Sequence, residues 1–110
     1  MSTYYPDLWV IIKLSGKGID GTLYKVFGCW YGGYMGSDSW KVNSGITKVS
    51  QSEKEYTFSG VSGSKYVCTK GSYGTSGYGG GVLNGMIEAS KGIGVTIEIL
   101  PKDYDFESIV

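Results

Sequence analysis

Residues 8–14 (LWVIIKL) constrain the fold more than any other stretch, because their apolar side chains fall on both alternating faces of a β-strand. Such a strand must be covered on both faces, so we expect it at the centre of the structure. The segment also contains the longest apolar run, residues 8–12, which is far shorter than the ~20 residues of a membrane-spanning helix. The pattern therefore predicts a soluble, β-rich protein that does not bind membranes.

Further strands are indicated by segments in which apolar and polar residues alternate. They cover residues 22–31, 40–50, 55–60, 65–70 and a last strand that contains Val95, Ile97 and Ile99. Within 40–50 the alternation loses its phase between Ile46 and Val49, and we expect a β-bulge near Ser44 and Gly45 to restore it. Short polar turns between the segments predict antiparallel pairing of strands that follow one another in sequence.

A helix is expected near the end of the chain. Four apolar residues recur at helical spacing and Gly92 follows them as a C-terminal stop, so the pattern predicts a short helix over residues 79–90. The four residues are Val82, Leu83, Met86 and Ile87. The predicted fold class is mainly β, a β-rich α+β fold built as an antiparallel meander sheet, a small sandwich or a partly open barrel, with this one helix.

The chain of 110 residues is expected to form a single domain, residues 1–110, because two cores would each be too small to offset the entropy of the chain. We expect residues 1–7 and 102–110 to be mobile tails. For the second tail, which is acidic with an apolar end, docking on a neighbouring subunit of a homo-oligomer is the alternative.

The composition argues against several kinds of chemistry. The chain has ten Lys against ten Asp plus Glu, neither Arg nor His, and a formal net charge of zero. Nucleic-acid binding usually needs a basic excess, so nucleic acid is not expected as a partner. Ser-His-Asp catalysis and His-ligated zinc require a residue that is absent, and no motif pairs two acidic residues. We therefore predict a protein that is not an enzyme, with no catalytic residues, no metal site and no cofactor.

The two cysteines point to a reducing compartment. Cys29 and Cys68 belong to no C-x-x-C motif, and no secretory signal precedes them. Free cysteine most often behaves as a small buried apolar residue. We expect two reduced, buried thiols in a cytoplasmic protein.

In the stretch 27–45, four large aromatic residues beyond Phe27 stand among glycines and short polar residues. These aromatics are Trp30, Tyr31, Tyr34 and Trp40. Flat rings on a permissive backbone are typical of a surface that stacks on a base, a sugar or an aromatic side chain, and Asp38 and Asn43 would bond the polar edges of such a ligand. The alternative is that the rings fill a thin core and the polar residues stabilise turns.

The segment 71–81 (GSYGTSGYGGG) is the second candidate loop. Backbone N–H groups at the start of a helix favour a phosphate, and Lys70 would add positive charge. The segment lacks the ending of a P-loop and the G-x-G-x-x-G spacing, so a mobile surface loop is the other interpretation. We expect the loops 31–39 and 71–81 to form opposite walls of one cleft. The candidate ligand-binding residues are Trp30, Tyr31, Tyr34, Asp38, Trp40, Asn43, Lys70, Tyr73 and Tyr78.

Several of these segments resemble parts of small uncharacterised proteins encoded by bacteriophages and prophages. The segments are 30–34 (WYGGY), 36–41 (GSDSWK), 43–45 (NSG), 62–64 (SGS) and 73–78 (YGTSGY). The resemblance implies expression in the cytoplasm of a bacterial host and an accessory role such as blocking host immunity. Phage inhibitors of this kind are typically small, non-enzymatic and often oligomeric.

Three functions are compatible with these features. In the first, the chain is a counter-defence protein that sequesters a small nucleotide-like signal in the aromatic and glycine-rich cleft. In the second, the same aromatic loop occludes a bacterial defence protein, in the manner of an anti-CRISPR protein, and needs no phosphate cradle. A small hydrolase or transferase is the third, which the missing histidines disfavour.

Overall fold

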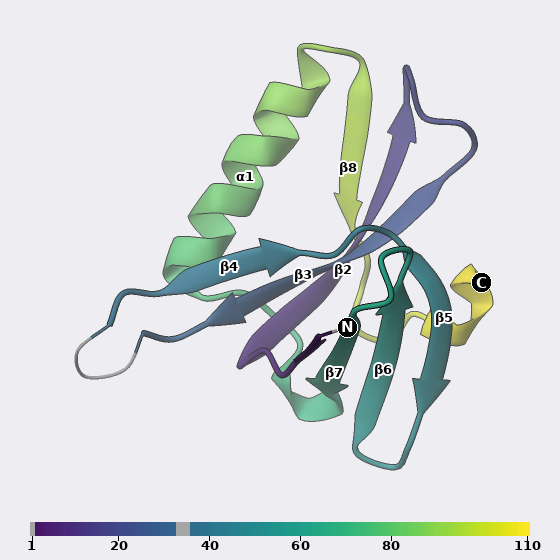
Figure 1. Cartoon of the computed structure of the whole chain (residues 1–110). Coiled ribbons are helices and arrows are strands. Elements are labelled where there is room, and N and C mark those ends of the chain that lie inside the picture. The colour runs from purple at the N-terminus through teal and green to yellow at the C-terminus, as the bar shows by residue number, and fades with distance from the viewer. Residues whose placement is uncertain (1, 33–35) are drawn as a thin grey trace.

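The computed structural model describes residues 2–32 and 36–110, which form two four-stranded β-sheets and an α-helix (Figure 1). Sheet A contains, in order, β1 (Thr3–Tyr4), β7 (Lys65–Thr69), β6 (Glu55–Gly60) and β5 (Ile46–Gln51). Sheet B contains β4 (Ser39–Val42), β3 (Leu23–Trp30), β2 (Leu8–Gly16) and β8 (Val95–Ile99). Sheet A packs on one face of sheet B, and α1 (Gly77–Lys91) packs on the other.

This arrangement confirms the predicted fold class, which is mainly β with one short helix. The strands form two packed sheets rather than a single meander, and neither sheet closes into a barrel. Two short 3-10 turns, η1 (Lys70–Ser72) and η2 (Phe106–Ile109), complete the elements. In the ranges 2–32 and 36–110, no helix has the length and apolar character needed to cross a membrane.

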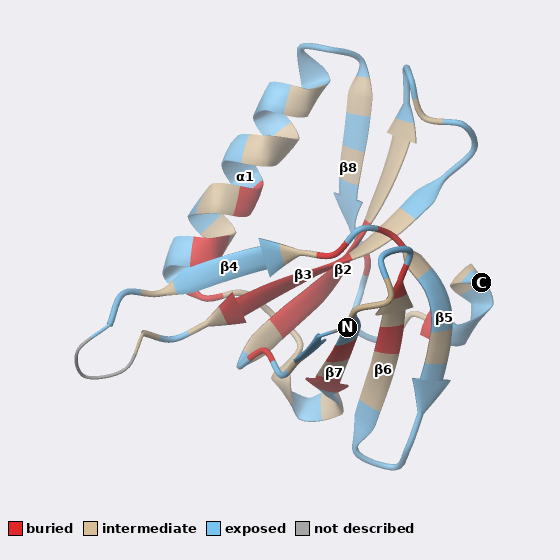
Figure 2. Cartoon of the chain, in the orientation of Figure 1, coloured by how far each residue is buried: buried red, intermediate tan, exposed pale blue. Residues whose placement is uncertain are grey.

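The central position predicted for residues 8–14 is confirmed. The strand β2 pairs with β3 on one side and with β8 on the other, both antiparallel. Trp9 and Ile11 face sheet A, while Val10 and Ile12 face α1, and all four are at most 4% exposed (Figure 2). One strand therefore contributes to both layers of the core, which explains why it is apolar on both faces.

The prediction of a single bulged strand over residues 40–50 is wrong. The chain leaves sheet B after Val42, which pairs with Phe27, and enters sheet A at Ile46, which pairs with Gly60. The three residues between them form a crossover in which Gly45 has a φ of +130°, a conformation that favours glycine. The loss of phase between Ile46 and Val49 coincides with an irregular register of β5, between Ile46 and Lys48, which lies just after the crossover rather than near Ser44 and Gly45.

Both ends of the chain are attached to the core. Strand β1 pairs in parallel with β7, with Tyr4 opposite Tyr66. At the other end Phe106 is 1% exposed and packs among the aromatic residues between the two sheets. The segment 102–110, for which a mobile tail or docking on a neighbouring subunit was expected, therefore packs in this structure on the core of its own chain.

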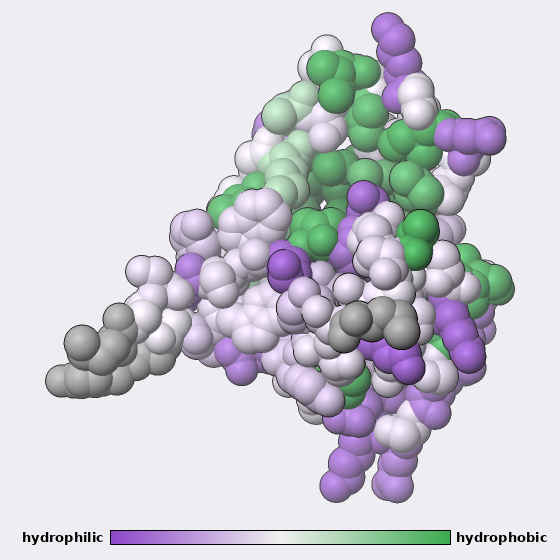
Figure 3. Space-filling model, in the orientation of Figure 1, coloured by the Kyte–Doolittle hydropathy of each residue, from purple (hydrophilic) through white to green (hydrophobic). Residues whose placement is uncertain are grey.

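The helix α1 begins two residues earlier than predicted, and Ser76 caps it by accepting a hydrogen bond from the Gly79 amide at 3.0 Å. A β-carbon at position 79 would collide with Cys29 Sγ, so glycine lets the first turn lie directly on sheet B. One turn later Leu83 is buried against the same sheet. Apolar side chains gather over α1 and β8 in Figure 3.

Cys29 and Cys68 are buried free thiols, as predicted. Cys29 lies in the layer between sheet B and α1, and Cys68 lies between the two sheets. Sheet B therefore separates the two sulfur atoms. Burial raises the pKa of the Cys68 thiol far above its ordinary value, so this side chain is neutral at physiological pH.

Candidate functional site

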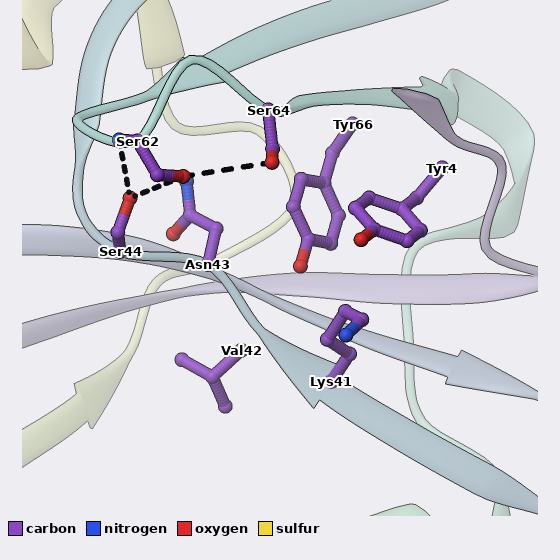
Figure 4. Close-up of a pocket in the computed structure, with 8 residues that line it drawn as sticks. All are labelled: Tyr4, Lys41, Val42, Asn43, Ser44, Ser62, Ser64 and Tyr66. Carbon is purple, nitrogen blue, oxygen red and sulfur yellow. Dashed lines mark hydrogen bonds between the residues drawn. The ribbon is translucent and has the colours of Figure 1, made fainter. Parts of the chain in front are cut away.

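A pocket of about 230 Å³ opens where the chain crosses from sheet B to sheet A (Figure 4). Its walls come from β1, the end of β4, the crossover, the turn between β6 and β7, and β7 itself. The lining residues are Tyr4, Lys41, Val42, Asn43, Ser44, Ser62, Ser64 and Tyr66. We call this the crossover pocket.

Asn43 is the most deeply placed polar residue of the crossover pocket. It is 4% exposed, and its Oδ1 atom accepts a hydrogen bond from the Val26 amide at 2.9 Å. That bond assigns the other amide atom as Nδ2, which has no hydrogen-bond partner among the described residues. Leaving a buried donor unpaired costs about 1–3 kcal/mol, so a group that accepts from Nδ2 would relieve a real penalty.

Three serines form the wall of the crossover pocket toward which the Asn43 amide points (Figure 4). The Ser44 hydroxyl accepts from the Ser62 amide at 3.0 Å and donates to the Ser62 hydroxyl at 3.3 Å. The Ser62 hydroxyl in turn donates to Ser64 at 3.5 Å. These long bonds between hydroxyls are weak, so each hydroxyl can turn to donate to another molecule.

Gly60 lies behind this wall and leaves space for the Ser44 and Asn43 side chains. A β-carbon there would come within 2.9 Å of Ser44 Oγ and 3.3 Å of Asn43 Nδ2. Both distances are shorter than ordinary carbon contacts. The absence of a side chain at this position therefore lets Ser44 and the Asn43 amide lie this close to the backbone of β6.

The opposite wall consists of two tyrosines and a lysine. Lys41 Nζ lies 5.0 Å from the centre of the Tyr4 ring, a cation–π contact that holds the ammonium group at the pocket. The Tyr4 and Tyr66 rings lie 5.1 Å apart. Burial, with a smaller contribution from Tyr4, raises the pKa of Tyr66 to about 12, so its phenol stays protonated and can donate a hydrogen bond at neutral pH.

Three of the predicted site residues are neighbours of Cys29 in the sheet, along the chain or through the packing of α1. Trp40 is directly opposite Cys29 in the pairing of β3 with β4, Tyr31 follows β3, and Tyr78 precedes the glycine that packs on Cys29 Sγ. Their exposed fractions are 37% for Trp40, 58% for Tyr31 and 53% for Tyr78. We call these three residues the aromatic surface.

The Trp40 side chain is fixed by a buried aromatic residue. Its ring stacks on the buried Phe27 ring with 5.6 Å between centroids and 7° between planes. Phe27 itself is 0% exposed. The indole therefore presents one face to solvent while its other face is fixed, as expected of an anchor residue at a binding surface.

Trp30, Asp38 and Tyr73 form hydrogen bonds within the fold. The Trp30 indole donates to the Tyr5 carbonyl at 3.1 Å, and Asp38 accepts from the Gly32 amide at 3.0 Å. The Tyr73 hydroxyl accepts from the Ile11 amide at 3.1 Å and donates to the Leu100 carbonyl at 2.7 Å. Trp30 and Asp38 thus bond within the fold, as the alternative interpretation of the stretch 27–45 expected, whereas Tyr73 packs inside the fold, a role that neither interpretation of the segment 71–81 gave it.

Lys70 lies away from the aromatic surface, at the end of β7 opposite to Tyr66. Its Nζ donates to Gln51 Oε1 at 2.6 Å and lies 4.9 Å from the centre of the Tyr56 ring. Tyr34 lies outside the described residues. Tyr31, Trp40 and Tyr78 thus share Cys29 as a neighbour, whereas Lys70 lies at the far end of β7 and Tyr73 packs inside the fold.

Sequence reasoning found only Asn43 of the crossover pocket. Four of the other lining residues lie in the segments that carry the phage resemblance, but that resemblance assigns no role to them; they are Lys41, Ser44, Ser62 and Ser64. One signal was present, because the alternation set by Trp40 and Val42 has the polar Ser44 at its next apolar position, directly after Asn43. Reading that failure as a change of sheet would have pointed to a junction lined by polar groups.

Comparison of the chain with protein-family models, with curated proteins and with solved structures gives no match in any of the three. Among residues 2–32 and 36–110, no three His, Cys, Asp or Glu side chains lie close enough together to hold a metal ion. Interpretation of the two sites therefore rests on their own geometry.

Proposed function

We propose that this protein is a non-catalytic accessory protein that acts by binding and occluding a partner protein through the aromatic surface. The observation that carries the proposal is the position of Tyr31, Trp40 and Tyr78, which are each more than a third exposed around one buried residue, Cys29. Tyrosine and tryptophan are the residues most enriched among the anchors of protein interfaces, because they bury a large area at a low entropic cost.

The arrangement favours a protein partner over a nucleotide at this surface. A nucleotide would need a cation or free amides close to the rings, and Lys70 is engaged with Gln51 and Tyr56 instead. At the start of α1, the Gly79 amide donates to the Ser76 side chain and the Gly80 amide donates to the Ser76 carbonyl. Two amides that would form the proposed phosphate cradle are thus already paired.

The resemblance to phage and prophage proteins supplies the class of partner. It implies a bacterial cytoplasm and a role in counter-defence, so the partner is a host defence protein whose working surface is covered by this chain. Occlusion of this kind needs a complementary shape and aromatic anchor residues rather than catalytic groups, which agrees with a chain that lacks histidine.

Plaque assays test this proposal. Expression of the chain in bacteria that each carry one defence system should raise the plating efficiency of a sensitive phage for one of the systems. A triple variant, Tyr31→Ala, Trp40→Ala, Tyr78→Ala, should lose this effect, and should bind the purified defence component at least about tenfold more weakly by calorimetry.

Ile93→Ala is the matched control, because Ile93 is 68% exposed and follows the opposite end of α1. It should behave like the parent protein. A triple variant that keeps its near-ultraviolet circular dichroism and still protects the phage would refute the aromatic surface. A rise in melting temperature with cyclic or dinucleotide signals, lost in the triple variant, would instead favour sequestration of a nucleotide.

A further inference from the structure

We propose that the crossover pocket is a second binding site, distinct from the aromatic surface, and that it binds the phosphate group of a small phosphate monoester. The inference rests on three features of the pocket: a buried amide donor without a partner, a set of reorientable hydroxyls, and a single positive charge at the rim.

The polar groups that line the pocket can all donate hydrogen bonds. Asn43 offers a free N–H group, Lys41 offers its ammonium group, and the serine and tyrosine hydroxyls offer the remainder. The part of the lining that the structure describes contains no Asp or Glu. A ligand that fits must therefore be rich in acceptors, and a phosphate group, with several charged oxygens, matches donors that converge from two sides.

The charge of the pocket favours an anion over a neutral acceptor. Among the described residues that line the pocket, Lys41 is the one that carries a charge, and its ammonium group lies against the Tyr4 ring. The ion pair identified among the described residues joins Lys91 and Glu88 on α1 and does not involve Lys41. The positive charge of Lys41 is thus available to a bound anion.

The size of the pocket limits what surrounds the phosphate. Sites for drug-sized ligands have volumes of about 300–1,000 Å³, and the crossover pocket, at about 230 Å³, lies below that range. A dinucleotide would not be enclosed. The pocket suits a phosphate with a small group attached, whose remaining part extends into solvent past the exposed residues Ser44 and Ser62.

A phosphate at this position would touch both sheets. Lys41 and Asn43 belong to the end of β4 and the crossover, whereas Ser62, Ser64 and Tyr66 belong to the β6–β7 turn and β7. Binding should therefore stabilise the contact between the two sheets.

Titration of the ¹⁵N-labelled protein tests the proposal. The probes are inorganic phosphate, ribose 5-phosphate and adenosine monophosphate, with adenosine and chloride as controls at constant ionic strength. We expect saturable shifts of the Asn43 side-chain amide and of the Ser62 and Ser64 backbone amides with every phosphate, and none with adenosine. Saturation by inorganic phosphate alone would show that the phosphate group suffices, and tighter binding of one ester would identify the attached group.

Two variants distinguish the pocket from general attraction of anions. Lys41→Met should weaken phosphate binding at least about tenfold, since it removes the charge and keeps the length of the side chain. Lys48→Met, at an exposed site on β5 outside the pocket, should leave binding unchanged. Asn43→Asp should also abolish binding, because it keeps the acceptor for Val26 and places a carboxylate oxygen where Nδ2 was.

Lys41→Met decides the matter if Asn43→Asp fails to fold, because Lys41 is exposed and its removal leaves the buried residues intact. Absence of saturable shifts up to about 10 mM phosphate, where even millimolar affinity would be visible, overturns the proposal. Equal weakening by Lys41→Met and Lys48→Met also overturns it. Neither result bears on the aromatic surface, since Lys41→Met leaves Tyr31, Trp40 and Tyr78 in place.

Discussion

The two faces of sheet B differ in how completely they are covered. Toward sheet A, its side chains meet a layer of aromatic residues, and eight residues of that layer are buried. Toward α1, five residues are buried, and Leu23, Trp40 and Ile99 remain 37–42% exposed. Leu23 and Ile99 lie opposite Leu14 and Ile12 in the sheet, so they share the face that α1 covers.

The difference follows from what covers each face. A second sheet supplies Phe58, Tyr66 and other large side chains, and Phe106 closes the edge of that layer. A single helix that contains several glycines supplies one fully buried side chain, Leu83. The layer between the sheets therefore contributes more to stability than the helix side, which keeps apolar and aromatic surface available for binding.

The largest expected effect compares two phenylalanines that are both 0% exposed, Phe58 between the sheets and Phe27 beneath α1. Phe58→Ala should destabilise the protein by about 4–5 kcal/mol and Phe27→Ala by about 3 kcal/mol, at the two ends of the usual range. Phe58 is fixed among Trp9, Tyr56 and Phe106, whereas the half-exposed Trp40 can move into the space left by Phe27. Urea unfolding measures both free energies. An equal or reversed order would show that the layer between the sheets does not contribute more to stability than the helix side.

A smaller effect separates two glycines of α1. Gly79→Ala should destabilise the protein by about 1–3 kcal/mol, because the added methyl group collides with Cys29 Sγ. Gly85→Ala should stabilise it by about 0.5–1 kcal/mol, because a β-carbon there meets nothing within 4 Å and alanine favours the helix. Thermal unfolding followed by circular dichroism distinguishes the two signs, and a stabilising Gly79→Ala would mean that the first turn of α1 does not lie on sheet B.

The last prediction concerns Tyr66, in the layer between the sheets, whose titration changes the stability only in alkaline solution. Its pKa is raised from 10.0 to about 12, so the folded protein holds the phenolic proton more tightly than the unfolded chain does. The resulting stabilisation is present below about pH 10 and is lost as the pH rises toward about 12. The urea midpoint should therefore fall over this range, and the fall should be shallower in Tyr66→Phe.

Tyr73 limits how much of that fall Tyr66→Phe can remove. Burial also raises the pKa of Tyr73, so part of the pH dependence should persist in the variant. A variant whose urea midpoint falls as steeply as that of the parent protein would show that Tyr66 ionises as it does in the unfolded chain.

Much of the fold could be predicted because it depends on local patterns. The two-faced apolar segment identified the central strand, and the spacing of Val82, Leu83, Met86 and Ile87 identified the helix to within two residues of its start. The sequence also indicated the aromatic residues of the stretch 27–45, and two of them, Tyr31 and Trp40, are exposed together with Tyr78.

The candidate sites were less predictable, because they depend on which segments meet. Lys70 follows a strand that also supplies Tyr66, yet the length of β7 places the two at opposite ends, so only Tyr66 lines the crossover pocket. Tyr73 carries the same aromatic side chain as the exposed Tyr78, but it bonds Ile11 and Leu100 inside the fold. Residue type alone does not distinguish such a pair.

The sequence by itself determined the central strand, most of the other strand segments and the helix, because periodicity along the chain follows directly from the geometry of one strand or one helix. Only the tertiary structure decided that residues 40–50 divide between two sheets, that β8 pairs with β2, and that the C-terminal segment closes the core. Pairings of this kind join residues far apart in the chain, and their energies depend on side chains that no local pattern brings together.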